Sequence, residues 1–117
     1  MKLNPRKEKN GITMNNETYW LDGYVLAPKS LVEHQKKVRF MYRDTPVSPS
    51  DSGWRFFSGD EPDEYVNVPE NIGLYDVSTI ISIDPDIAPF LQAPYGVAFE
   101  RDDTKQPFAR TNFTPVE

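Results

Sequence analysis

The 117-residue chain contains no cysteine and a single histidine, His34. Without cysteine there is no disulfide, no thiolate zinc or iron–sulfur site and no cysteine nucleophile. A single histidine also excludes metal sites built from several histidines and any His–His acid/base pair. The sequence therefore excludes thiolate chemistry and any site built from several histidines.

Long apolar runs are missing too. No stretch approaches the roughly 18 apolar residues that a membrane helix needs, and no apolar segment of a secretory signal follows the polar start Met1–Asn10. We therefore expect a cytoplasmic protein without a membrane partner. The length fits a single domain, since domains cluster near ~100–150 residues.

Recognised catalytic motifs are also missing. The sequence has no Gly-x-Ser-x-Gly elbow and no glycine-rich phosphate loop, and His34 lies in the polar stretch Val32–Lys37. Two carboxylates can act as a glycosidase pair, but an acidic sequence contains so many possible pairs that their presence does not indicate this activity. We expect no catalytic residue and no cofactor.

Charge is distributed unevenly along the chain, although the net value is only −5. Residues 1–43 hold nine Lys and Arg against four Asp and Glu, whereas residues 44–117 hold four against fourteen. Between 51 and 86, nine acids accompany a single base, Arg55. Such a stretch repels nucleic acid phosphates and attracts a basic protein partner. A plainer alternative is that loop acids keep a small domain soluble.

Hydrophobic patterning predicts an α+β fold, with a small antiparallel sheet and two or three short helices packed on it. We expect residues 1–18 to be a poorly ordered lead-in and residues 19–117 to form one domain. The expected strands are 23–27, 38–43, 54–57 and 95–100. The expected helices are 31–36, 77–83 and 85–91, with a helical turn near 63–67.

Helix starts carry recognisable capping residues. Ser30 with Glu33 makes a capping box for the first helix, Asp76 is the expected N-cap of the second, and Asp84 precedes Pro85 at the start of the third. In the polar tail, Phe108 and Phe113 are the expected anchors.

The stretch Gly53–Glu61 is the most informative part of the sequence. We expect Gly53 and Gly59 at turn positions with positive φ, and a strand that places Trp54 and Phe56 on one face with Arg55 and Phe57 on the other. A buried Trp54 needs an acceptor for its indole N–H. For Arg55 the expected ion-pair partners are Asp51, Asp60 or Glu64.

The acids that follow, Asp60, Glu61, Asp63 and Glu64, raise the question of calcium. An EF-hand loop places glycine after its first acids and a glutamate further on, whereas Gly59 precedes the acids here. We therefore assign no metal site. An unrecognised metal-binding protein or enzyme built on these carboxylates stays open as the least favoured alternative.

Several motifs together resemble the immunity protein thirty-three family of bacterial polymorphic toxin systems, over residues 23–101. They are Met41-Tyr42-Arg43, Asp51–Glu61, Asp63-Glu64-Tyr65, Asn71–Tyr75, Asp84–Ile87 and Gly96–Arg101. The resemblance implies an α+β protein that binds and neutralises a cognate toxin. It implies no catalytic residues, since none is established for the family.

These observations lead to one hypothesis about the binding site. We assign partner contact to an acidic face that consists of Asp60, Glu61, Asp63, Glu64 and Tyr65. We assign a structural role to the strand motif before it, which consists of Gly53, Trp54, Arg55, Phe56 and Gly59. The partner would be a basic toxin domain. The runner-up is a regulatory or housekeeping binding module without a toxin, and the oligomeric state is left open.

Overall fold

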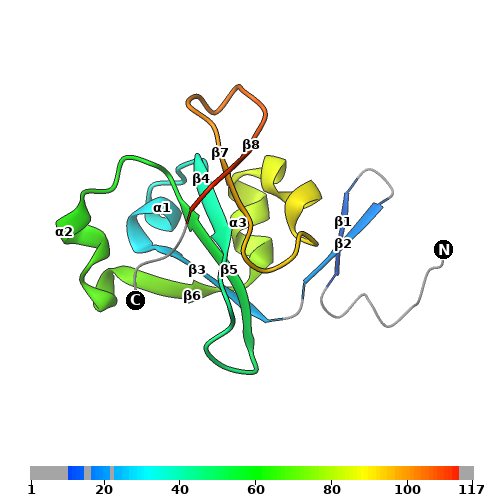
Figure 1. Ribbon diagram of the computed structural model, residues 1–117, viewed down its shortest axis with the longest axis horizontal. Coiled ribbons are helices and arrows are strands. Elements are labelled where there is room, and N and C mark those ends of the chain that lie inside the picture. The colour runs from blue at the N-terminus through cyan, green and yellow to red at the C-terminus, as the bar shows by residue number, and fades with distance from the viewer. Residues whose placement is uncertain (1–10, 15–16, 22, 114–117) are drawn as a thin grey trace.

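The structure, a computed structural model, describes residues 11–14, 17–21 and 23–113. Its main body is a six-stranded sheet with the order β6-β3-β5-β4-β7-β8 (Figure 1). The strands are β3 (Tyr24–Pro28), β4 (Phe40–Arg43), β5 (Asp51–Phe57), β6 (Ile72–Tyr75), β7 (Ala98–Glu100) and β8 (Ala109–Thr111). The α+β class expected from the sequence is confirmed.

A separate two-stranded hairpin precedes this sheet. Its strands β1 (Gly11–Met14) and β2 (Glu17–Trp20) pair antiparallel with each other. The expected lead-in over 1–18 also includes residues 1–10, 15 and 16, which lie outside the described residues. Tyr19 and Trp20 are the last residues of β2, opposite Ile12 and Gly11, and Leu21, buried in the core, follows them.

One pair of neighbouring strands, β3 with β5, is parallel, so the expectation of an antiparallel sheet was wrong at this point. β3 and β5 run parallel, with Tyr24 opposite Asp51 and Leu26 opposite Arg55, while the other four neighbouring pairs are antiparallel. A parallel pair needs a crossover connection. The segment between the two strands, α1 (Lys29–Glu33) followed by β4, provides it, because β5 inserts between β3 and β4.

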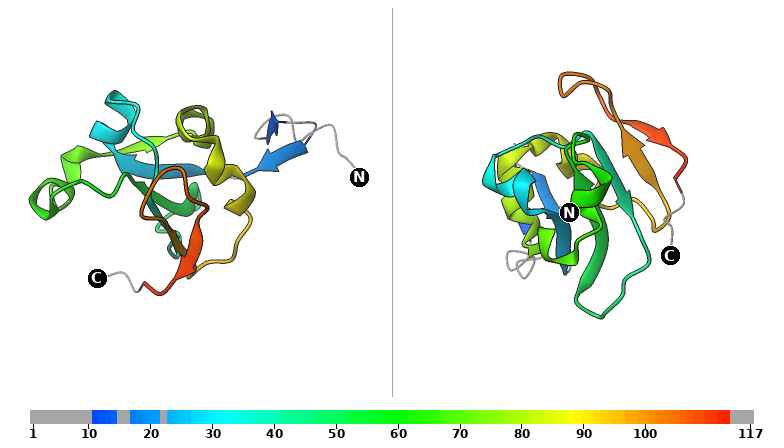
Figure 2. Two further views of the ribbon diagram at one scale, coloured as in Figure 1. Left: turned by 90° about the horizontal axis from the view of Figure 1, so that it is seen from above. Right: turned by 90° about the vertical axis from the view of Figure 1, so that its left-hand side faces the viewer.

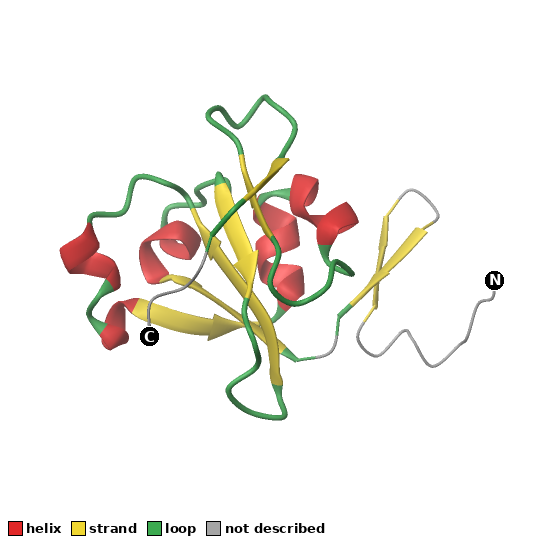
Figure 3. Ribbon diagram, viewed as in Figure 1, coloured by secondary structure: helices red, strands yellow, loops and turns green. Residues whose placement is uncertain are grey.

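Helices α1, α3 (Val77–Ile83) and η3 (Pro85–Phe90) pack on one face of the sheet (Figures 2 and 3). Leu31, Ile80 and Ile87 from these helices join a single core cluster with the inward side chains of the strands. Those inward side chains are Val25, Ala27, Met41, Trp54 and Phe56. Burial of this apolar surface is what holds the helices to the sheet.

Two of the three expected helix starts are correct in position. α3 has Asp76 as its N-cap residue, and η3 starts at Pro85 with the Asp84 carboxylate accepting the amide of Asp86. The capping box at Ser30 was wrong. α1 begins directly after Pro28, the last residue of β3, so Ser30 lies inside the helix.

The alternation along β5 is confirmed. Trp54 and Phe56 are fully buried in the core, whereas Phe57 is half-buried on the opposite face beside Phe40. β5 is longer than the expected strand over 54–57 and starts at Asp51, because Asp51 pairs with Tyr24 of β3.

The two edge strands of the sheet, β6 and β8, were not expected. The short helices α2 (Asp63–Val66) and η2 (Pro69–Asn71) lie between β5 and β6, and α2 confirms the helical turn expected near 63–67. Figure 1 shows α2 projecting beside the sheet. Across the described parts of the chain, no helix is both long and apolar enough to cross a membrane.

Candidate protein-binding surface

The strand motif Gly53–Gly59 fixes the sheet to its surroundings. The indole Nε1 of Trp54 donates to the carbonyl of Leu91, 3.0 Å away, just after η3. Gly53 has φ +92°, and a Cβ there would collide with the carbonyl oxygen of Asp44. Only glycine suits both the backbone conformation and the close approach.

Arg55 selects Asp51 as its partner, not Asp60 or Glu64. Both Nη atoms lie 2.8 Å from Asp51 oxygens, and the two side chains are 7% and 0% exposed. Burial alone would raise the pKa of Asp51. Hydrogen bonds from the Arg55 guanidinium and from the amides of Val47 and Gly53, together with the charge of Arg55, outweigh it and lower the pKa to about 2.

Asp60 and Glu61 are engaged within their own turn. Glu61 accepts hydrogen bonds from the amides of Ser58 and Gly59, at 2.9 and 3.1 Å, and lies 2.7 Å from the Ser58 hydroxyl. The Asp60 carboxylate lies 2.8 Å from the Lys36 ammonium and 2.6 Å from the same hydroxyl, and these hydrogen bonds lower its pKa. Both carboxylates therefore shape the turn through their hydrogen bonds.

Asp63, Glu64 and Tyr65 belong to α2. Asp63 and Glu64 occupy its first turn and are exposed, where the helix dipole favours negative charge. The Tyr65 hydroxyl accepts the amide of Ser30, 3.1 Å away, and so ties α2 to the first turn of α1. Of the five predicted binding residues, Asp63 and Glu64 are those with the most accessible charge.

Four aromatic side chains gather on the sheet face opposite the helices. This aromatic cluster consists of Phe40 and Tyr42 from β4, Phe57 from β5, and Phe113 beyond β8. Phe113 lies 4.9 Å from Phe40 and 4.6 Å from Tyr42 between ring centroids, and Tyr42 is stacked with Phe57 at 6.1 Å. The three strand residues are half-buried and Phe113 is 41% exposed.

A groove of about 390 Å³ joins the aromatic cluster to the acidic segment, residues 58–71. Glu61, Asp63 and Val66 line its other side. Sequence reasoning missed this juxtaposition, because it depends on how the chain after β5 folds back over the outward face. A partial signal existed, since Phe40 and Tyr42 alternate along one strand and Phe57 shares a face with Arg55.

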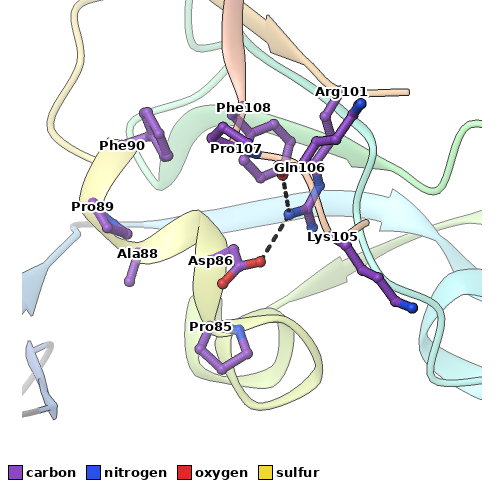
Figure 4. A pocket seen from close by; sticks show the side chains of 10 residues that line it. All are labelled: Pro85, Asp86, Ala88, Pro89, Phe90, Arg101, Lys105, Gln106, Pro107 and Phe108. Atoms are coloured by element: carbon purple, nitrogen blue, oxygen red, sulfur yellow. Dashed lines mark hydrogen bonds and ion pairs between the residues drawn. The ribbon is translucent and has the colours of Figure 1, made fainter. Parts of the chain in front are cut away.

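A second groove, of about 560 Å³, lies between η3 and the 101–108 loop (Figure 4). Arg101 lines it, but its donors are already used. Nη1 binds Asp86 and the Gln106 carbonyl, Nη2 binds Asp84, and Nε binds the Val38 carbonyl. This arginine holds the fold together and is not available to recognise a ligand.

No group of three or more His, Asp or Glu side chains gathers into a possible metal site within the described residues. Asp60, Glu61, Asp63 and Glu64 follow one another in sequence, yet the first two turn toward Lys36, Ser58 and Gly59. Their arrangement is that of a hydrogen-bonded turn followed by a helix start.

The comparison with protein families decides what kind of protein this is. The model of the immunity protein Imm33 domain matches residues 25–112, which is most of the chain. The chain belongs to this family. No curated protein and no solved structure gives a match.

The Imm33 match covers the sheet from Val25 in β3 through β8, together with the acidic segment, the groove beside η3 and all of the aromatic groove's lining except Phe113. Three members of the aromatic cluster lie inside the match, and Phe113 lies one residue past its end. An immunity domain implies a protein partner in general. The resemblance noted from the sequence is thereby confirmed at the level of the family.

Proposed function

We propose that this Imm33 domain binds and neutralises a cognate toxin domain in the cytoplasm, without catalysing a reaction itself. The family supplies the class of partner, a protein toxin. The observation that carries the proposal is the position of the acidic segment. It borders an aromatic groove on the solvent-facing side of the sheet.

The acidic segment, residues 58–71, contains five carboxylates and no basic residue. Charge of one sign beside an apolar patch is suited to fast and selective encounter with a basic partner. A toxin that acts on nucleic acid has a basic cleft, which is complementary to this surface. A toxin with an acidic or neutral surface would gain nothing from it.

The five residues of the binding face contribute in different ways. Asp63 and Glu64 supply exposed charge, and Asp60 and Glu61 supply charge held in a rigid turn. Tyr65 contacts Ser30 through its hydroxyl and orients α2. The rings of the aromatic cluster add buried area at contact, where Tyr and Phe often dominate the binding energy.

Expression with the protein encoded by the neighbouring reading frame tests the proposal. We expect this domain to protect cells from that protein, to copurify with it at low salt and to release it at high salt. The variant D63K/E64K should protect poorly. The matched control D102K/D103K has the same change in net charge at two adjacent exposed positions outside the acidic segment, and it should protect fully.

Two results would overturn the proposal. Absence of any protection or copurification, with the domain folded, would favour a regulatory or housekeeping module without a toxin. Equal protection by D63K/E64K and by its control would place the binding surface elsewhere on the domain.

A further inference from the structure

We propose that the groove between the aromatic cluster and α2 seats an arginine side chain of the partner. The guanidinium would lie on the ring faces of Tyr42 and Phe57 and pair with Glu61 and Asp63. This inference rests on the proposed function only in taking the partner to be a protein. The groove itself is tested below without a toxin.

The groove is lined by aromatic rings, over whose faces a cation can bind. Tyr42 and Phe57 stand nearly parallel, with 9° between their planes, and both are half-buried. Phe113 forms a wall, since its ring meets Phe40 edge-on at 76°. A cation over an aromatic face gains about 0.5–1 kcal/mol at an exposed site and more when water is displaced.

The rim supplies negative charge that is already in place. Glu61 is held by the amides of Ser58 and Gly59, so its carboxylate need not be ordered when a ligand binds. Asp63 is exposed at the start of α2. The described residues that line the groove include these two carboxylates and no basic side chain.

The cations near the groove are already occupied. Lys36 is paired with Asp60 at 2.8 Å, and Arg39 donates to the carbonyls of Ser58 and Asp102. They hold the turn in place. Among the described residues no ion pair is formed by Glu61 or Asp63, although the charge of Glu61 also acts on Lys36. A basic group from outside therefore completes the charge balance of the groove.

Size and shape favour arginine over a larger ligand. At about 390 Å³ the groove lies near the lower end of the ~300–1,000 Å³ range of small-ligand sites, enough for one or two side chains. Arginine combines a planar face that stacks on rings with a fork of donors that fits carboxylates. Lysine carries its charge on a compact ammonium group and lacks both the planar face and the fork of donors.

Capped tripeptide amides test the groove directly. We would titrate acetyl-Gly-Arg-Gly-amide into the full chain and follow the aromatic ring signals by NMR. The control peptide carries citrulline, which is uncharged and nearly the same shape. We expect the Arg peptide to shift the signals of Tyr42, Phe57 and Phe113 at low salt and the citrulline peptide to bind about tenfold more weakly. High salt should weaken binding of the Arg peptide and leave that of the uncharged citrulline peptide nearly unchanged.

Variants locate the effect within the groove. F57L keeps an apolar side chain but removes a ring face, and D63N removes an exposed charge. Each variant should bind the Arg peptide about two- to fivefold more weakly, which is the ratio that a contribution of about 0.5–1 kcal/mol gives. The controls L74A, on the same sheet face but outside the groove lining, and E70Q, outside that lining, should bind the Arg peptide as wild type does. Circular dichroism checks that each variant is folded.

Equal binding of the Arg and citrulline peptides, or shifts confined to other parts of the protein, would overturn the inference. Its failure is separable from failure of the proposed function. If the domain neutralises a toxin but does not bind the Arg peptide, the proposed function stands and the arginine site is refuted. If the domain binds the peptide in the groove but protects from no toxin, the arginine site stands and the proposed function is refuted.

Discussion

Asp84 and Arg101 form an ion pair in the interior of the protein. Oδ2 of Asp84 lies 2.7 Å from Nη2 of Arg101, and the side chains are 0% and 1% exposed. The same carboxylate oxygen accepts the amide of Val38, whose carbonyl accepts Nε of Arg101. The pair therefore joins the start of β4, the turn between α3 and η3, and the end of β7.

Removing the charge of Asp84 should destabilise the fold strongly. D84N leaves a buried guanidinium without its inner carboxylate, and breaking such a pair typically costs about 3–5 kcal/mol. The control D86N removes the other partner of Arg101, but that carboxylate is 55% exposed, so the expected cost is below about 1 kcal/mol. Urea unfolding of both variants measures the difference, and equal losses would contradict this view of Arg101.

Stability should fall in acid as Asp51 takes up a proton. The pKa of Asp51 is about 2 in the folded protein, below the ~3.9 of an unfolded chain. Its contribution, on the order of 2 kcal/mol, is therefore complete above about pH 4 and lost as the pH falls toward 2. The difference in unfolding free energy between wild type and D51N should shrink over that window, and a constant difference would be the opposite result.

Two glycines with the same φ allow the cost of backbone strain to be measured apart from the cost of a steric clash. Gly53 and Gly96 both have φ +92°, but a Cβ on Gly53 would strike the Asp44 carbonyl, whereas a Cβ on Gly96 meets nothing within 4 Å. G96A should cost about 1–2 kcal/mol from backbone strain alone. G53A should cost clearly more in the same thermal melts, and similar losses would show that β5 relaxes freely.

Tyr65 should act through the position of α2. Y65F removes the acceptor of the Ser30 amide, which should lower the unfolding free energy by about 1 kcal/mol. Toxin affinity should change little, because the ring stays in place. A large loss of affinity with unchanged stability would instead make the hydroxyl a direct contact.

Local patterns predicted much of the fold. Asp76 and Asp84-Pro85 marked two helix starts correctly, and the alternation of Trp54 and Phe56 with Arg55 and Phe57 gave the faces of β5. These features depend on residues close in sequence. The parallel pairing of β3 with β5 depends on where the chain returns after α1 and β4, and no local signal encodes that.

The site was predictable only in part. Acidity after β5 is plain in the sequence, but the turn that engages Glu61 depends on its two amide donors, and Tyr65 meets a residue 35 positions away. At Ser30 the local sequence and the tertiary structure disagree. The residues Ser30 to Glu33 suit a helix cap, yet the helix begins earlier, directly after Pro28 at the end of β3, and the Ser30 amide donates to the Tyr65 hydroxyl.

The central claim, that the acidic segment steers a basic toxin to this surface, is tested most directly by association kinetics. Stopped-flow rates would be compared for wild type, D63K/E64K and the control D102K/D103K at low and high salt. The claim predicts about a tenfold or larger loss of the association rate for D63K/E64K at low salt, fading at high salt, with a much smaller change in the control. An association rate unchanged in D63K/E64K at every salt concentration, in a complex that still forms, would contradict it.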